Sequence, residues 1–277
     1  MTRGVLIFAQ NNSEIDYAKI SLYAAQRVEQ FLNVPVSLVT DSKDWLLQSQ
    51  PTAKLVFDRI ITINSDTSQT KKFYDGTLSG KTLTWKNLSR SDCYELSPYD
   101  ETLVIDSDYI ISSNTLSNIW NNVNDFLIYQ DSFDLAQWRD DSSFKYLNQT
   151  SIPFYWATAF YFKKSPANQA FFDIVKYIKA NWSYYRSLYS IDSVVFRNDF
   201  AFSIAIHMMG NEFAKPLPGK MNYTLDRDVL VDIKDSALQF LVEKKNYSGE
   251  YIATKTNNLD MHVMNKYSLT RYIETVL

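Results

Sequence analysis

The first forty residues carry the feature that most restricts the fold, a strand, a helix and a second strand in close succession. Residues 4–10 (GVLIFAQ) and 36–40 (VSLVT) are apolar runs of strand length. Between them, residues 16–32 place apolar side chains such as Ile20 and Val28 at helical spacing. A strand–helix–strand unit of this length is right-handed with parallel strands. The pattern therefore predicts an α/β fold with a mixed, mostly parallel central sheet flanked by helices.

The loops that follow these two strands open at the same edge of such a sheet. The first strand ends at Gln10 and is followed by Asn11 and Asn12, and the second is followed by Asp41. Neither loop has the Gly-x-Gly-x-x-Gly pattern of a dinucleotide-binding site or the glycine-rich sequence of a P-loop. These absences argue against the commonest oxidoreductases and NTPases.

The composition limits the remaining classes. A chain of 277 residues with 45% hydrophobic residues can bury a large core, and we expect one domain over residues 1–277, with a nucleotide-binding half (about 1–112) and an acceptor-binding half (about 113–277). The net charge of −3 offers no general footprint for nucleic acid. The single cysteine, Cys93, excludes an intrachain disulfide and makes a cytoplasmic location the expectation. No apolar run approaches the length of a membrane span.

The rest of the chain continues the alternation of strands and helices. Further strands are predicted at residues 57–63, 126–129, 152–162, 229–233 and 251–254, and further helices at residues 81–96, 114–122, 166–182, 193–209 and from Ser268 onward. Residues 66–84 are polar and are predicted to form a loop that borders the site.

Two groups of charged residues in this stretch have both a structural and a functional interpretation. Lys86 and Arg90 precede the central acidic motif, and they are either solvated residues of a helix face or phosphate contacts. The triplet Arg197-Asn198-Asp199 interrupts an apolar helix, and it is either a cap or a ligand contact.

The central acidic motif follows a short apolar run. Residues 103–105 (LVI) indicate a buried strand, and Asp106-Ser107-Asp108 comes directly after it. In an extended segment the side chains of residues i and i+2 point the same way, so Asp106 and Asp108 can converge. Such a pair is either a turn in which aspartate bonds its own backbone or a site for Mg²⁺ or Mn²⁺ and a diphosphate. Ligands of α/β folds lie at the carboxyl ends of strands, which favours the second interpretation.

The order of residues around this motif resembles a known family. Residues 89–103 (SRSDCYELSPYDETL) lead into residues 104–108 (VIDSD). Together they are similar to the arginine-bearing helix, the following segment and the metal motif of glycogenin-like and lipopolysaccharide-galactosyltransferase-like glycosyltransferases, which are called family 8 and have the GT-A fold. The resemblance covers most of the chain as an ordering of elements and implies a distant member of that family.

The resemblance implies roles for residues at both ends of the chain. By analogy Asp106 contacts the metal and the ribose, Asp108 holds the metal, and Ser107 lies with them in the donor site. The family's third ligand is a histidine near the carboxyl end, followed by a lysine that grips the diphosphate; His262 and Lys266 stand in those places. One nitrogen and two carboxylates favour Mn²⁺, with Mg²⁺ as the alternative.

The implied donor is a nucleoside-diphosphate sugar, most simply a UDP-sugar. Its base would lie in the opening lined by Gln10, Asn11, Asn12 and Asp41. The departing diphosphate would be stabilised by the metal.

Four side chains are the candidates for the chemistry beyond the metal. Lys266, with Arg90 or Lys86, would help to stabilise the leaving group. Asp199 is the candidate contact for the donor sugar or the acceptor hydroxyl. The family implies retention of anomeric configuration; for inversion, Asp199 would be the general base.

Other functions remain open from the sequence. A nucleotidyltransferase of similar fold also uses aspartate-bound Mg²⁺, but it needs a glycine-rich loop after the first strand, which this chain lacks. A non-catalytic carbohydrate- or nucleotide-binding protein is a third possibility. The acceptor is a hydroxyl of unknown class: a glycan, a lipid-linked sugar, a protein or, as the weaker option given the acidic balance, a modified DNA base.

Overall fold

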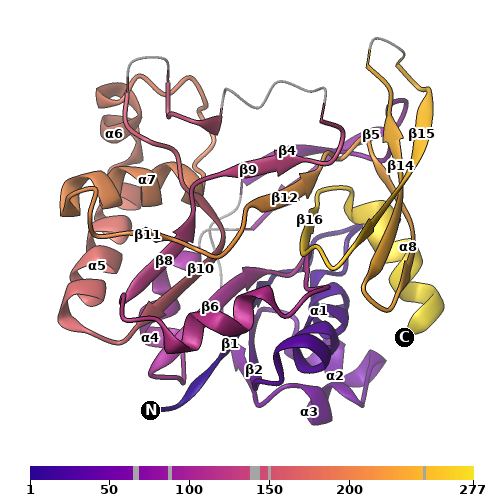
Figure 1. The fold of residues 1–277 in the computed structure, drawn as a ribbon, viewed down its shortest axis with the longest axis horizontal. Helices are drawn as coiled ribbons and strands as arrows, with labels where there is room; N and C mark the ends of the chain where they lie inside the picture. The colour runs from indigo at the N-terminus through magenta and orange to yellow at the C-terminus, as the bar shows by residue number, and fades with distance from the viewer. Residues whose placement is uncertain (65–68, 87–88, 138–143, 149–150, 246–247) are drawn as a thin grey trace.

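A seven-stranded sheet forms the centre of the protein. The computed structural model describes residues 1–277 except 65–68, 87–88, 138–143, 149–150 and 246–247 (Figure 1). From edge to edge the strands are β11 (Lys215–Pro216), β8 (Phe126–Tyr129), β10 (Trp156–Lys163), β6 (Glu101–Asp106), β1 (Arg3–Ala9), β2 (Val36–Thr40) and β3 (Arg59–Thr62). Neighbouring strands are parallel except at β10, which is antiparallel to both β6 and β8. The predicted mixed, mostly parallel α/β sheet is confirmed.

Helices cover both faces of this sheet. The bounds are α1 (Tyr17–Leu32), α2 (Lys43–Ser49), α3 (Ala53–Val56), α5 (Pro166–Ala180), α6 (Trp182–Leu188) and α7 (Asn198–Met209). Val5 and Ile7 of β1 pack in one core with α1, whereas Leu6 packs in a second core with α5 and α7. This alternation follows from the two-residue period of a strand. Each fully buried side chain of this kind contributes about 1.5–3 kcal/mol, so both faces hold the sheet in place.

Two smaller sheets come mainly from the C-terminal part of the chain. One contains β7 (Tyr109–Ile110), β16 (Met261–Val263), β12 (Met221–Thr224) and β9 (Ser132–Asp134), and the other contains β13 (Val229–Lys234), β14 (Ala237–Glu243) and β15 (Tyr251–Asn257). A third core joins them to α1 and to the last helix, α8 (Lys266–Val276). The yellow end of the chain in Figure 1 thus returns to β7, the strand that follows β6.

A separate hairpin of β4 (Gln69–Tyr74) and β5 (Gly80–Trp85) corrects two sequence expectations. A loop was expected over 66–84 and a helix over 81–96. The helical part is confined to a 3₁₀ turn, η1 (Ser89–Asp92), and the short α4 (Cys93–Leu96). The strands escape detection because they are rich in Thr and Lys, and only Phe73 and Leu83 are buried. Residues 66–68 and 87–88 lie outside the described residues.

Several other elements start or end away from their expected positions. The helix expected from residue 193 starts at Asn198, because Arg197 before it has extended backbone (φ −129°, ψ 138°). The strand expected from residue 152 starts at Trp156, and the helix expected over 114–122 is a 3₁₀ helix, η2 (Thr115–Asn121). Among the described residues, no helix is long and apolar enough to cross a membrane.

Candidate functional site

The acidic motif lies where the central sheet meets the C-terminal sheet. Strand β6 ends at Asp106, and the chain passes through Ser107 and Asp108 into β7. Strand β16 pairs with β7 so that His262 stands opposite Tyr109. A backbone bond from the Val263 N–H to the Asp108 carbonyl (2.9 Å) fixes this register. The topology therefore carries a residue near the carboxyl end of the chain to the tip of β6.

The three predicted metal-ligating side chains are brought together by this pairing. One ligand atom from each of Asp106, Asp108 and His262 lies within 4.8 Å of the others. His262 Nε2 is 3.3 Å from an Asp108 carboxylate oxygen and 4.0 Å from an Asp106 carboxylate oxygen. Asp108 and His262 are buried, and Asp106 is partly buried.

Each carboxylate of this group also meets a cation. Lys266 Nζ contacts Asp108, and the Arg90 guanidinium contacts Asp106. Burial alone would raise the pKa of Asp108, but Lys266 and His262 hold it well below its usual range. Burial lowers the pKa of His262 from its ordinary value of 6.5. The site at neutral pH thus consists of an ionised carboxylate and a neutral imidazole, the forms in which both bind metals.

The residues present fit a divalent cation. Octahedral ligands at about 2.1 Å from an ion are about 3 Å apart, close to the separation of His262 Nε2 and Asp108. Oxygen and imidazole donors together suit Mn²⁺ or Mg²⁺. Lys266 Nζ contacts a carboxylate oxygen of Asp108 that such an ion would also contact. When the ion binds, the ammonium could exchange this contact for one with an anionic ligand of the metal.

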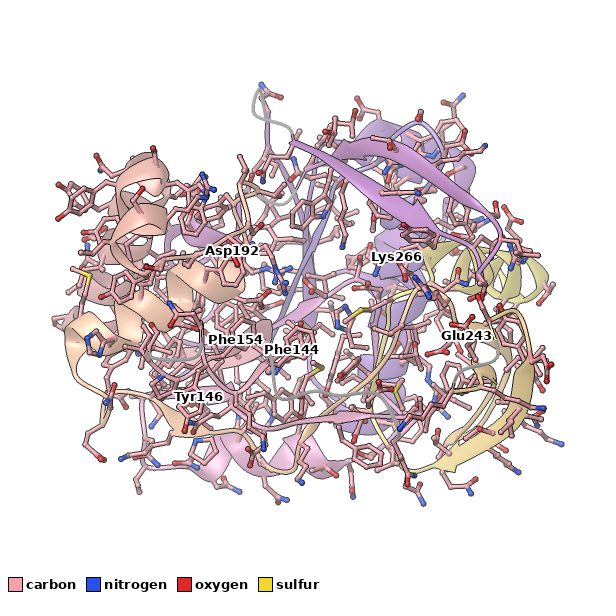
Figure 2. All side chains as sticks on the ribbon, turned by 90° about the horizontal axis from the view of Figure 1, so that it is seen from above. Phe144, Tyr146, Phe154, Asp192, Glu243 and Lys266 are labelled. Atoms are coloured by element: carbon pink, nitrogen blue, oxygen red, sulfur yellow. The ribbon has the colours of Figure 1, made fainter. Side chains whose placement is uncertain are left out.

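A cavity of about 500 Å³ opens above these side chains, within the range of small-molecule sites. Gln10, Phe144 and Trp156 line it together with the acidic group and Lys266. Figure 2 labels Phe144 and Lys266, which reach it from distant parts of the chain. Gln10 is buried, and its side-chain Nε2 has no hydrogen-bond partner among the described residues. A buried donor of this kind favours a ligand that offers an acceptor oxygen.

A chain of polar contacts joins the acidic group to the start of α7. Arg90, which contacts Asp106, donates from Nη1 to the Ala157 carbonyl (2.6 Å). The Ala157 N–H donates in turn to Asp199 Oδ1 (2.9 Å). Asp199 Oδ2 accepts from Arg197 at 2.6 Å. One residue of β10 therefore positions both Arg90 and Asp199, and both line the cavity.

Of the other predicted binding residues, Ser107 and Lys86 line the cavity, whereas Asn11, Asn12 and Asp41 do not appear in its lining. Asn11 bonds Asp16 and the Ala18 N–H at the start of α1. Asn12 donates to the Thr84 carbonyl. Asp41 accepts from Lys86 Nζ at 2.7 Å, and so lies one contact away from the cavity.

Sequence reasoning missed the residues that the hairpin contributes to the cavity. Lys71, Phe73 and Trp85 line it from β4 and β5. The available signal was weak: residues 83–85 (LTW) alternate as in a strand with one covered face, and residues 69–74 (QTKKFY) end in two aromatic residues. The predominance of Thr and Lys masks that alternation.

Comparisons with known proteins give structural similarities only. No family model matches the sequence, and no curated protein sequence matches it. Among solved structures, the glycosyltransferase GlyE of Streptococcus pneumoniae TIGR4 is similar over 78% of this chain, with 11% identity and a TM-score of 0.47; the match spans only 45% of that protein. The galactosyltransferase LgtC in complex with donor and acceptor sugar analogs matches 77% of this chain and 72% of its own, at 12% identity and a TM-score of 0.49.

A nucleotidyltransferase is similar at a comparable level. A putative glucose-1-phosphate thymidylyltransferase from Bacillus anthracis matches 79% of this chain and 87% of its own, with 8% identity and a TM-score of 0.43.

Proposed function

We propose that this protein is a glycosyltransferase that moves a sugar from a nucleoside-diphosphate sugar, most simply a UDP-sugar, to a hydroxyl acceptor with the help of a divalent cation. The observation that carries the proposal is the meeting of Asp106, Asp108 and His262 within 4.8 Å at the floor of a cavity. The resemblance of residues 89–108 to family 8 supports the same activity.

The donor would lie with its diphosphate over the acidic group. Mn²⁺ or Mg²⁺, when bound there, supplies positive charge that offsets the charge developing on the departing diphosphate. Lys266, displaced from Asp108, would bind a phosphate oxygen. Arg90 keeps Asp106 in place, since it is buried and tied to the Ala157 carbonyl as well as to that carboxylate. The free donor group of Gln10 would face the nucleoside.

Asp199 would mark the sugar end of the cavity. Its carboxylate is held from two sides, by the Ala157 N–H and by Arg197, so its orientation is fixed before substrate arrives. Such preorganisation suits a contact to a sugar hydroxyl. We infer retention of anomeric configuration from the resemblance, and the configuration of the product is measurable by NMR.

A panel of nucleotide sugars, each tested with and without Mn²⁺, is the direct experiment. A true donor should raise the melting temperature only when the metal is present. At a donor concentration of a hundred times its dissociation constant, binding adds about 2.7 kcal/mol to the free energy of unfolding. Hydrolysis or transfer of the sugar by the same preparation identifies the activity. If nucleotide binds without any dependence on metal, the proposal is wrong.

Two other outcomes separate the alternative functions. Release of pyrophosphate from a nucleoside triphosphate and a sugar phosphate would indicate a nucleotidyltransferase, although no glycine follows β1 in residues 10–13. Metal-dependent UDP binding without turnover of any sugar nucleotide would indicate a binding protein.

A further inference from the structure

The hairpin presents one face to the cavity, and that face carries a lysine among aromatic residues. In the register of β4 and β5, Lys71 stands opposite Leu83. Phe73 lies two residues farther along β4 and Trp85 lies diagonally across on β5, both on the same face as Lys71. Lys71 Nζ lies 5.2 Å from the centre of the Trp85 ring and 5.6 Å from that of Phe73. All three aromatic and basic side chains line the cavity.

The hairpin is tied down along its length, so this face is fixed in position. Gln69 exchanges two hydrogen bonds with the backbone of Phe196 (2.8 and 3.1 Å). Asn12 donates to the Thr84 carbonyl (3.1 Å), and Asp75, at the turn, pairs with Arg271 of α8 (2.7 Å). Lys71 is consequently presented to the cavity by an anchored wall.

Among the residues that the structure describes, none forms an ion pair with Lys71. Within the described part of the chain, no ion pair or hydrogen bond of its ammonium is found, only the two ring contacts. The residue as a whole is exposed, but protein surrounds its ammonium group. This desolvation is the main cause, and repulsion from Lys266 and Arg197 the second, that lowers the pKa of Lys71 to about 8. Attraction of the ammonium by Asp108 and Asp226 offsets these two effects only in part. Desolvation is thus the largest of these effects, and the ammonium stands in the cavity wall without a paired carboxylate among the described residues.

The proposed donor does not account for this charge. Four other cations of the cavity each meet a carboxylate: Lys86 with Asp41, Arg90 with Asp106, Arg197 with Asp199 and Lys266 with Asp108. Lys72 also lines the cavity, but it belongs to the other face of β4 and lies over the Tyr74 ring rather than with Phe73 and Trp85. A divalent cation and a diphosphate carry opposite charges of about equal size, so their arrival leaves the balance unchanged.

We propose that the acceptor carries an anionic group, a phosphate or a carboxylate, and that Lys71 binds it on the inner face of the hairpin. The inference rests on the proposed function, since it names the chemical class of the second substrate of that site. A charged group would contact the ammonium, and the neighbouring aromatic faces suit the sugar or other ring that carries it.

Calorimetry with inorganic sulfate, an anion that stays soluble with Mn²⁺, tests the inference on protein saturated with UDP and Mn²⁺. Lys71→Met keeps the length and apolar stem of the side chain, Lys71→Arg keeps the charge, and Lys81→Met removes a lysine charge from an exposed position of the same hairpin that pairs with Glu14. Sulfate affinity should fall at least tenfold in Lys71→Met and stay within threefold of wild type in the other two. The affinity for UDP with Mn²⁺ should be unchanged in all three.

Each other outcome has a definite meaning. Equal sulfate affinity in wild type and Lys71→Met, or no sulfate binding at all, overturns the inference. A tenfold loss of UDP affinity in Lys71→Met also overturns it, because Lys71 would then serve the donor diphosphate. If wild type does not bind UDP with Mn²⁺, the proposed function fails, and sulfate titration of the unloaded protein still tests Lys71 alone. An unchanged or higher melting temperature of Lys71→Met shows that the variant is folded.

Discussion

The floor of the cavity consists of the tips of β6 and β16, whereas one wall consists of the hairpin β4–β5, and the two hold their charges differently. On the floor, Asp106 and Asp108 are each in contact with a cation from a neighbouring element. On the wall, Lys71 has only ring contacts within the described residues. The floor is also fixed by backbone pairing through both sheets, whereas the hairpin is held to the rest of the protein by the packing of Phe73 and Leu83 in the third core and by side-chain hydrogen bonds.

Under the proposed function, we infer separate tasks for the two regions from this difference. A preorganised, charge-balanced floor suits the chemical step, because its polar groups need little rearrangement when charge develops. An anchored wall on which Lys71 has no paired carboxylate among the described residues suits the choice of ligand, because it favours a molecule that brings negative charge. Substitutions on the floor should therefore change turnover, and substitutions on the wall should change affinity.

The largest expected effect is that of Asp108→Asn on the floor. The amide keeps the shape of the side chain but removes the charge that a divalent cation requires, so metal-dependent transfer or hydrolysis should fall by about 10²–10³-fold or more. Turnover of a UDP-sugar with Mn²⁺ measures the loss. Asp173→Asn, at an exposed position of α5, is the matched control. Full activity in Asp108→Asn would show that the floor is not the reactive part.

The next effect is a pH dependence that belongs to the wall. The pKa of Lys71 is lowered to about 8 from its ordinary value of 10.5, so the ammonium is charged below pH 8 and is lost above it. Sulfate affinity should fall about tenfold per pH unit above 8 in wild type, and Lys71→Arg should retain it, because arginine stays protonated. Four other charged groups act on this position, and both the wild type and Lys71→Arg retain them: Lys266, Arg197, Asp108 and Asp226.

The lowered pKa of Lys71 also makes the free energy of unfolding depend on pH. Because the folded state releases this proton at lower pH than the unfolded chain, the stability of wild type should rise relative to Lys71→Met between pH 8 and 10.5. Urea unfolding at a series of pH values measures this difference. A constant difference across that range would mean that Lys71 is not desolvated.

A smaller effect concerns the anchoring of the hairpin. Gln69→Ala removes both bonds to the Phe196 backbone, and we expect a loss of about 1–2 kcal/mol in the free energy of unfolding, together with weaker sulfate binding. Gln239→Ala, at an exposed position of β14, is the control for loss of a glutamine side chain. Unchanged stability and sulfate affinity in Gln69→Ala would mean that the hairpin keeps its place without this tie.

The smallest effect is expected at the turn of the hairpin. Arg271→Ala removes a two-point ion pair with Asp75, but about half of the Arg271 side chain is exposed, so solvent screening limits the loss to about 0.2–1 kcal/mol. The bond from Arg271 lowers the pKa of Asp75, so this contribution is present above the ordinary value of 3.8 and disappears as the pH falls below it. Urea midpoints of wild type and variant at neutral and acidic pH should therefore converge on acidification.

The sequence allows the central sheet to be predicted well and the hairpin hardly at all, for a physical reason. Residues 36–40 and 126–129 are buried on both faces, so their apolar runs coincide with the strands. In β4 and β5 only Phe73 and Leu83 are buried, and the other positions are free to be polar. A pattern dominated by Thr and Lys is therefore equally typical of a loop.

For the site, the sequence indicates the candidate ligands but not their surroundings. Asp106 and Asp108 follow from their place after an apolar run, and His262 came from a family resemblance that the pairing of β16 with β7 accommodates. Lys71 could not be recognised from the sequence, because its interest depends on whether a carboxylate lies next to it once the chain is folded. Ion pairing of this kind joins residues far apart in the chain and leaves no local pattern.

The position of Ala157 has a consequence for protein engineering. Because its carbonyl accepts from Arg90 while its N–H donates to Asp199, the proposed donor end and the proposed acceptor end of the cavity are not independent of each other. A redesign that shifts the start of α7 to admit a bulkier alcohol would also disturb the guanidinium next to Asp106. A broader acceptor range should therefore come at the cost of turnover in this scaffold, unless the α7 side is rebuilt without moving Ala157.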